Sequence, residues 1–270
     1  MRMREYQVFL RWTFSRDLVN DGTLVDWVDT LEEKMQQPFV QWLPFGRATQ
    51  PLRWDANARL EQLDGRIGQG LNQELRMRLI AAPNPAGIVH LDVHANMHPY
   101  TGRYVVTCEL RVENDRVQSA EEVEGWADIL QRWAEQGEAL SGHMHEADDD
   151  AIQNVGSPGV LKLGYGVEVE SGPLASNPGR ETSRGEHRYV VNWLTFYGKE
   201  MMDALGWPAL EVEGLRTWRA HEGLWLRLSD APLPADAPEA RARQGAARTQ
   251  LGLQALADRQ QRSFGFWQKK

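Results

Sequence analysis

The sequence predicts an α+β fold in two layers, a largely antiparallel sheet covered by helices on one face. Three observations predict it. Two segments near the middle of the chain alternate apolar and polar residues with the period of two that marks a half-buried strand. The segment that follows them has the 3.6-residue period of an amphipathic helix. The second half of the chain is again rich in strand patterns, without a self-similarity firm enough to define a repeat.

The first 80 residues open as a strand followed by a helix. Residues 5–13 alternate like a strand, and residues 23–35 place their apolar side chains on one helical stripe. Residues 36–54 combine three prolines with four aromatic residues, which is typical of a loop whose aromatic side chains pack onto the core. Three glycines then interrupt residues 55–80, which we interpret as a broken helix.

The central strands cover residues 87–96 and 103–113, and a turn-rich stretch joins them. We expect them to form an antiparallel hairpin with one apolar face and one polar face, as a sheet covered on one side requires. The expected inner face holds Val89, Leu91, Val93, Val106, Cys108, Leu110 and Val112, and the expected outer face holds His90, Asp92, His94, Thr107, Glu109 and Arg111.

Residues 119–140 form the clearest helix in the sequence. Ser119 and Glu122 have the spacing of a capping box, in which each side chain bonds the backbone of the other residue. One stripe of this helix is apolar, so we expect it to cover the inner face of the central hairpin. The stripe consists of Val123, Trp126, Ile129, Leu130 and Trp133.

The second half of the chain predicts a strand at 160–170, a strand at 187–197, a short helix at 199–206 and a hairpin at 215–230 that turns at Glu222 and Gly223. The proline-rich run at 231–240 marks a linker. We therefore expect one α+β domain over residues 1–235 and a basic C-terminal helix or tail over residues 236–270.

Charge is unevenly distributed along the 270 residues. The net charge is −8, but the last thirty residues hold seven basic residues and one acid, which leaves 23 basic and 37 acidic residues in the first 240. An acidic body repels nucleic acid and attracts basic partners. The N-terminus has no signal-peptide core, and no stretch approaches the length of a membrane span. We expect a cytoplasmic protein that binds neither nucleic acid nor membrane.

The eleven tryptophans are the unusual feature of the composition. Tryptophan is enriched in protein cores and in the centres of interfaces, and we expect most of these to be core. The single cysteine, Cys108, cannot form an internal disulfide. Its place in an alternating strand predicts a small buried hydrophobe and not a nucleophile.

The sharpest chemical candidate is a metal site built from His90, His94 and His98 with nearby carboxylates such as Asp92. However, His90 and His94 would lie about 13 Å apart on a straight strand, too far to share one ion. His143 and His145 could supply donors, although a polar loop after a helix explains them as well. A metal-dependent hydrolase therefore stays the alternative to a binding protein.

No other catalytic template occurs in the sequence: it has no GxSxG elbow, no phosphate-binding GxxxxGK[ST] loop, no HExxH and no CxxC pair. We assign no catalytic residue, no metal and no cofactor. The common enzyme classes are disfavoured, and binding of another macromolecule is the function that remains.

Residues 189–234 carry a resemblance to a known family. They read YVVNWLTFYGKEMMDALGWPALEVEGLRTWRAHEGLWLRLSDAPLP, a strand ending in Trp-Leu-Thr, a short helix ending in Leu-Gly, and a hairpin followed by a proline-rich exit. This order resembles the C-terminal half of immunity proteins encoded beside type VI secretion and polymorphic toxins. The resemblance implies a cytoplasmic protein that binds and neutralises a cognate secreted toxin, and it carries over no functional residue.

We expect the toxin to be basic and to contact two surfaces, the outer face of the central hairpin and an acidic patch at residues 146–150. The expected contact residues are His90, Asp92, His94, Glu109, Arg111, Glu146, Asp148, Asp149 and Asp150.

Overall fold

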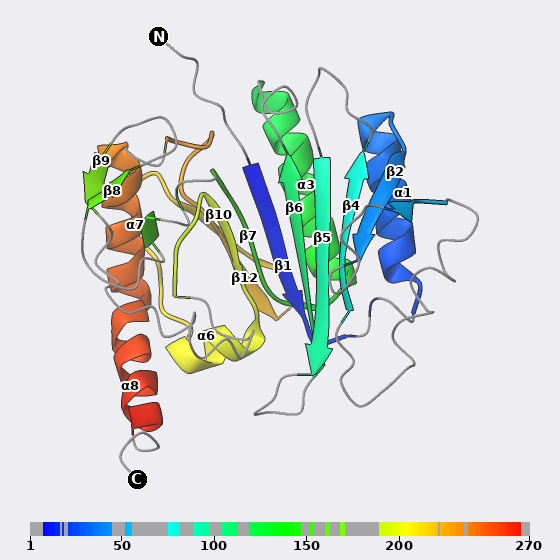
Figure 1. The fold of residues 1–270 in the computed structure, drawn as a ribbon. Helices are drawn as coiled ribbons and strands as arrows, with labels where there is room; N and C mark the ends of the chain where they lie inside the picture. The colour runs from blue at the N-terminus through cyan, green and yellow to red at the C-terminus, as the bar shows by residue number, and fades with distance from the viewer. Residues whose placement is uncertain are drawn as a thin grey trace. The chain divides into compact units, whose positions relative to one another are not determined.

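The computed structural model describes residues 8–16, 18, 21–44, 52–55, 75–81, 89–97, 104–112, 119–146, 149, 152–153, 160–162, 168–170, 189–220, 222–234 and 237–265. The chain divides into two compact units (Figure 1). The first comprises Gln7–Ala139, and the second comprises Leu140–Lys270 with Met1–Tyr6. Residues 236–270, expected to stand apart from the body, belong to the second unit. A single domain over residues 1–235 stays a prediction.

The first unit contains an antiparallel sheet in the order β1-β6-β5-β4-β2-β3. The predicted central hairpin is confirmed as β5 and β6, with His90 opposite Arg111 and Asp92 opposite Glu109. The strands are β1 (Val8–Phe14), β2 (Phe39–Pro44), β3 (Leu52–Arg53), β4 (Leu75–Ala81), β5 (Val89–Met97) and β6 (Tyr104–Val112).

The inner face of this sheet is buried as the alternation predicts. Leu91, Cys108 and Leu110 are fully inaccessible, and residues of the polar face are partly exposed. Burial raises the pKa of the Cys108 thiol to about 12, so it stays protonated at neutral pH and packs as a hydrophobe. This confirms the expected role of the cysteine.

Two helices, α1 (Thr23–Met35) and α3 (Ala120–Gln136), lie on the same side of the sheet. The predicted capping box of α3 is present. The indoles of Trp27 and Trp133 stack at 4.5 Å between ring centroids, and the Trp12 indole lies 5.0 Å from that of Trp133. Trp12 also donates a 2.9 Å hydrogen bond to the Leu130 carbonyl oxygen. These aromatic contacts hold α1, α3 and β1 together, because large rings bury much apolar area in fixed geometry.

Two predictions for the first unit are wrong. Residues 36–54 contain β2 and β3, and residues 75–80, expected in a broken helix, belong to β4. Pro38 precedes β2 and Pro44 is its last residue, positions where a strand tolerates the missing N–H. In β4, apolar and polar residues alternate from Leu75 to Leu79. The glycines that precede this strand obscure the signal.

The second unit contains an antiparallel sheet in the order β11-β12-β10-β7, and the separate pair β8 and β9. Both predicted hairpin strands near residue 220 are confirmed, with Ala220 opposite Gly223. The strands are β7 (Ala139–Glu146), β8 (Val160–Lys162), β9 (Glu168–Glu170), β10 (Leu194–Tyr197), β11 (Arg216–Ala220) and β12 (Gly223–Arg227).

The helices α6 (Lys199–Leu205), α7 (Pro238–Leu251) and α8 (Leu253–Gly265) accompany this sheet. The predicted short helix is confirmed as α6, which ends at Gly206 in the left-handed conformation that glycine favours. The expected strand at 187–197 is shorter, since only Leu194–Tyr197 pairs in the sheet. The C-terminal segment is helical and packs with buried Ala247, Leu251 and Leu253.

These elements confirm the predicted α+β class with an antiparallel sheet. Of the nine tryptophans whose side chains the structure describes, seven are buried, as expected. Among the described residues, no helix is long and apolar enough to cross a membrane.

Candidate functional site

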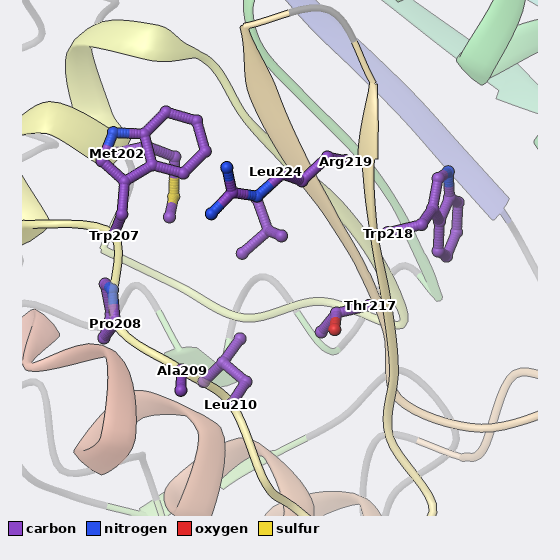
Figure 2. Close-up of a pocket in the computed structure, with 9 residues that line it drawn as sticks. All are labelled: Met202, Trp207, Pro208, Ala209, Leu210, Thr217, Trp218, Arg219 and Leu224. Atoms are coloured by element: carbon purple, nitrogen blue, oxygen red, sulfur yellow. The ribbon is translucent and has the colours of Figure 1, made fainter.

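A cavity of about 280 Å³ lies in the second unit beside β11, the edge strand of the sheet. Figure 2 shows its walls: the end of α6 and the following loop on one side, and β11 and β12 on the other. Seven of the nine lining residues have apolar side chains, and Arg219 is the one charged residue among them. The lining residues are Met202, Trp207, Pro208, Ala209, Leu210, Thr217, Trp218, Arg219 and Leu224.

Trp207 is placed at this cavity by the end of α6. Its backbone is left-handed, with φ of 51°, directly after Gly206 with φ of 76°. A bulky residue in this region is strained, and such strain persists only where the surroundings enforce it. The Trp207 indole donates a 3.0 Å hydrogen bond to Asp203, and Lys199 donates one of 2.7 Å to the other carboxylate oxygen. These two bonds lower the pKa of Asp203, because they favour the charged carboxylate.

Arg219 lies on β11 and reaches across the cavity toward Trp207 (Figure 2). Its guanidinium carbon stands 4.8 Å from the centre of the indole ring, within the range of a cation–π interaction. The side chain is exposed, and among the described residues no carboxylate pairs with it. The cavity thus combines several apolar side chains with one positive charge that the surrounding described residues do not neutralise.

The loop after Trp207 is held by α7. Gln250 on α7 accepts a 2.7 Å hydrogen bond from the Glu211 N–H and donates one of 3.4 Å to its carbonyl oxygen. Arg243 donates hydrogen bonds to the carbonyl oxygens of Leu228, at 2.6 Å, and Gly214, at 3.3 Å. Two residues of α7, Gln250 and Arg243, therefore hold the loop after Trp207, and Arg243 also holds the chain just after β12.

A buried polar network lies elsewhere in the same unit. Its centre is Asp149, which is only 4% exposed. Its carboxylate accepts hydrogen bonds from three side-chain amides and forms an ion pair with Arg241. The adjoining cavity measures only about 10 Å³, no more than a single water requires. The amide donors are Gln153 at 3.1 Å, Asn192 at 2.9 Å and Gln244 at 2.9 Å.

Gln153 connects this network to the backbone. Its amide donates a 2.9 Å hydrogen bond to the Val191 carbonyl oxygen and accepts one of 3.1 Å from the Val191 N–H. It also accepts a 3.0 Å bond from Arg248, a residue only 7% exposed. Burial lowers the pKa of Arg248, although so strong a base stays protonated at neutral pH. The side chain of Gln153 thus gives Val191 the hydrogen bonds that a strand partner would supply.

The burial of this network corrects one expectation. Glu146 and Asp149 are buried and so cannot form part of an exposed acidic patch, while Asp148 and Asp150 lie outside the described residues. Arg241, Arg243 and Arg248, which belong to the predicted basic C-terminal helix or tail, bind groups of their own unit.

The outer face of the first unit's sheet holds the other predicted contact residues. His90, Asp92, Glu109 and Arg111 are each partly exposed and lie in directly opposed pairs. His94 shares this face by register, opposite Thr107, and its side chain is outside the described residues, as is His98. Whether this face contacts a partner stays a prediction.

The described residues give no support to the alternative of a metal centre. Among them, no three His, Cys, Asp or Glu side chains gather in a way that could hold an ion. His143 and His145 lie on β7 and are buried with their rings stacked at 5.0 Å, so the expected polar loop is wrong. His145 donates a 2.9 Å hydrogen bond to the Glu146 carbonyl oxygen.

Comparison with known proteins identifies a shared fold. No protein-family model matches the sequence, and no curated protein matches it. Among solved structures, the chain is similar to the T6SS protein PA0821 of Pseudomonas aeruginosa, with a TM-score of 0.62 and 13% sequence identity. The match covers 92% of this chain and 76% of that chain. At this identity the likeness establishes the fold alone.

Proposed function

We propose that this protein is an immunity protein of a type VI secretion system, which binds a cognate effector and neutralises it. The observation that carries the proposal is the fold shared with a T6SS protein over 92% of the chain. The sequence of residues 189–234 independently resembles immunity proteins encoded beside such effectors. Neutralisation requires a stable complex and no chemistry of its own.

The cavity beside β11 is compatible with a binding role. Enzymes of the common classes place a nucleophile or an acid–base pair in a pocket. The side chains that line this cavity are instead apolar, apart from Thr217 and Arg219. A partly exposed tryptophan beside an arginine is the composition from which interface hot spots are built.

The charge of the body supports a basic effector. The first 240 residues hold 37 acids against 23 basic residues. Such an excess accelerates association with a positively charged partner and has its greatest effect at low salt. We propose the outer sheet face at His90, Asp92, Glu109 and Arg111 as a contact surface on the first unit.

The decisive experiment expresses the product of the adjacent gene in a bacterial host, alone and together with this protein. We expect growth arrest by that product alone, full growth on co-expression, and co-purification of the two chains. Growth arrest that persists in the presence of soluble, folded protein, with no complex recovered, would refute the immunity function.

A further inference from the structure

The exposed tryptophans mark an edge of the second unit. Of the nine tryptophans whose side chains are described, seven are buried, and Trp207 and Trp218 are the two that are not. Both contribute to the cavity lining at β11. Figure 2 shows the Trp207 ring at the cavity and the Trp218 ring projecting from the opposite side of β11. Large apolar rings left partly exposed on both sides of one edge strand indicate an interaction surface.

The volume of the cavity limits what it can take. At about 280 Å³ it falls just below the usual range for small-molecule and cofactor sites. That space suits one large apolar side chain of a protein partner, packed against Met202, Trp207 and Leu224. Interfaces concentrate their binding energy in anchors of this kind.

Arg219 favours a carboxylate at the one position of the partner that faces it, whatever the partner's net charge. Five other arginines of the second unit have an oxygen partner within the unit: Arg216, Arg227, Arg241, Arg243 and Arg248. Arg219 instead faces the Trp207 ring, and among the described residues it has no oxygen partner. A carboxylate placed over this guanidinium would gain a charge-assisted hydrogen bond.

The strand edge defines the shape of the partner. Among the described strands, β11 ends the order of its sheet, so its outer backbone groups can pair with an added strand. Side chains of an added strand alternate between the two sheet faces. One set would reach the cavity and Arg219, and the other set would reach Trp218.

We infer that an extended segment of the effector adds to the β11 edge, with an apolar side chain in the cavity and an Asp or Glu carboxylate on Arg219. The inference rests on the proposed function and assigns the surface by which the protein performs it. The cavity is preorganised for this contact, because Asp203 fixes the Trp207 ring and Gln250 fixes the following loop.

The test uses the full chain with the adjacent-gene product and two pairs of variants. Arg219→Glu reverses the charge at the cavity, and Arg259→Glu reverses an exposed arginine on α8 that also has no carboxylate partner among the described residues. Ala209→Trp fills the cavity without changing charge, and Ala246→Trp makes the same change at an exposed site of α7. Urea unfolding of each variant checks that its fold is intact.

We expect Arg219→Glu and Ala209→Trp each to weaken the complex by about tenfold or more and to lose protection of growth, as loss of an interface hot spot does. Arg259→Glu and Ala246→Trp should bind within about twofold of the wild type. Equal protection by all four variants would refute the β11 site and leave the immunity function standing. Failure of the wild-type protein to bind or protect would refute both. Equal weakening by the Arg259→Glu control would show that Arg219 acts only through net charge, which also contradicts the site.

Discussion

Two arginine-bearing regions of the second unit differ in whether their polar groups are buried and paired within the unit. Around Asp149, the guanidinium of Arg241 and three side-chain amides satisfy one buried carboxylate, and little space remains beside it. Around Arg219, a guanidinium faces an indole ring across an open cavity. The first region leaves little space for a partner, whereas the second leaves charge and apolar surface available.

The C-terminal segment, residues 236–270, contributes side chains to both regions. Its first helix supplies Arg241, Gln244 and Arg248 to the closed network and Gln250 to the loop at the open cavity. A segment that composition alone presents as a basic tail is therefore part of the framework. The closed network stabilises the fold, and that stability keeps the open site rigid for binding.

The largest effect should follow from breaking the closed network. Asp149→Ala leaves Arg241 and three amide groups without their shared acceptor, and removing one member of a buried pair costs about 3–5 kcal/mol. The free energy of unfolding in urea measures this loss. As a control, Asp230→Ala breaks the exposed pair with Arg216 and should cost less than about 1 kcal/mol. Equal losses in the two variants would contradict the contrast between buried and exposed pairs.

Deletion of residues 236–270 should also prevent stable folding of the second unit. It removes the buried Ala240, Ala247 and Leu251 together with every arginine and glutamine that α7 gives to Asp149, Gln153 and Glu211. A melting curve by circular dichroism, compared with that of the full chain, measures the effect. Retention of a cooperative transition at the full-chain temperature would show that α7 is dispensable.

A smaller effect distinguishes the two glutamine clamps. Gln153→Met removes the buried partner of Val191, and each buried group left without a partner costs about 1–3 kcal/mol. Gln250→Met removes the equivalent exposed clamp on Glu211, where water can replace the lost bonds. Hydrogen exchange should accelerate far more at the Val191 amide in the first variant than at the Glu211 amide in the second. Greater acceleration at the Glu211 amide than at the Val191 amide would show that the glutamine at the cavity contributes more to local stability than the buried one.

The strain at the cavity predicts an effect of about 1 kcal/mol. Because Trp207 has a positive φ, Trp207→Gly should be more stable than Trp207→Ala by roughly 0.5–1 kcal/mol, although glycine removes one more carbon. Both variants lose the indole, so their difference in urea reports the backbone alone. An alanine variant as stable as the glycine variant would show that the backbone relaxes freely at this position.

The smallest effect concerns pH. The folded-state pKa of Asp203 is lowered, so the contribution of its bonds to Lys199 and Trp207 is present above the ordinary carboxyl pKa and is lost as the pH falls below about 4. The Trp207 indole N–H resonance should therefore shift on acidification below that pH. In the Asp203→Asn variant the titration should be absent. An indole resonance that shifts identically with pH in the wild type and in the variant would show that Asp203 does not bind the Trp207 indole.

The central hairpin and α3 could be predicted because their patterns are local. The alternation from Val89 to Val112 and the stripe around Trp126 each reveal a buried face without knowledge of distant partners. β2 and β4 could not be predicted in this way, because prolines at the strand ends and nearby glycines are typical of loops and helix breaks. Proline breaks a ladder only where its N–H is needed.

The sites depend on contacts that no local pattern contains. Asp149 belongs to an acidic run, and its burial follows from Arg241, which is 92 residues away. The cavity draws its walls from α6, the loop after it, β11 and β12. Its one local signal is the Leu-Gly-Trp-Pro sequence at 205–208, where glycine ends the helix and places the tryptophan.

The most direct test of the open site is photocrosslinking in cells that express the adjacent-gene product. The photoreactive residue p-benzoylphenylalanine replaces Ala209 at the cavity, Ala246 on α7, or Arg111 on the outer face of the first unit. We expect a covalent adduct with the effector from position 209 and none from position 246. An adduct from position 111 alone, with none from position 209 in a protein that still protects growth, would contradict the β11 site.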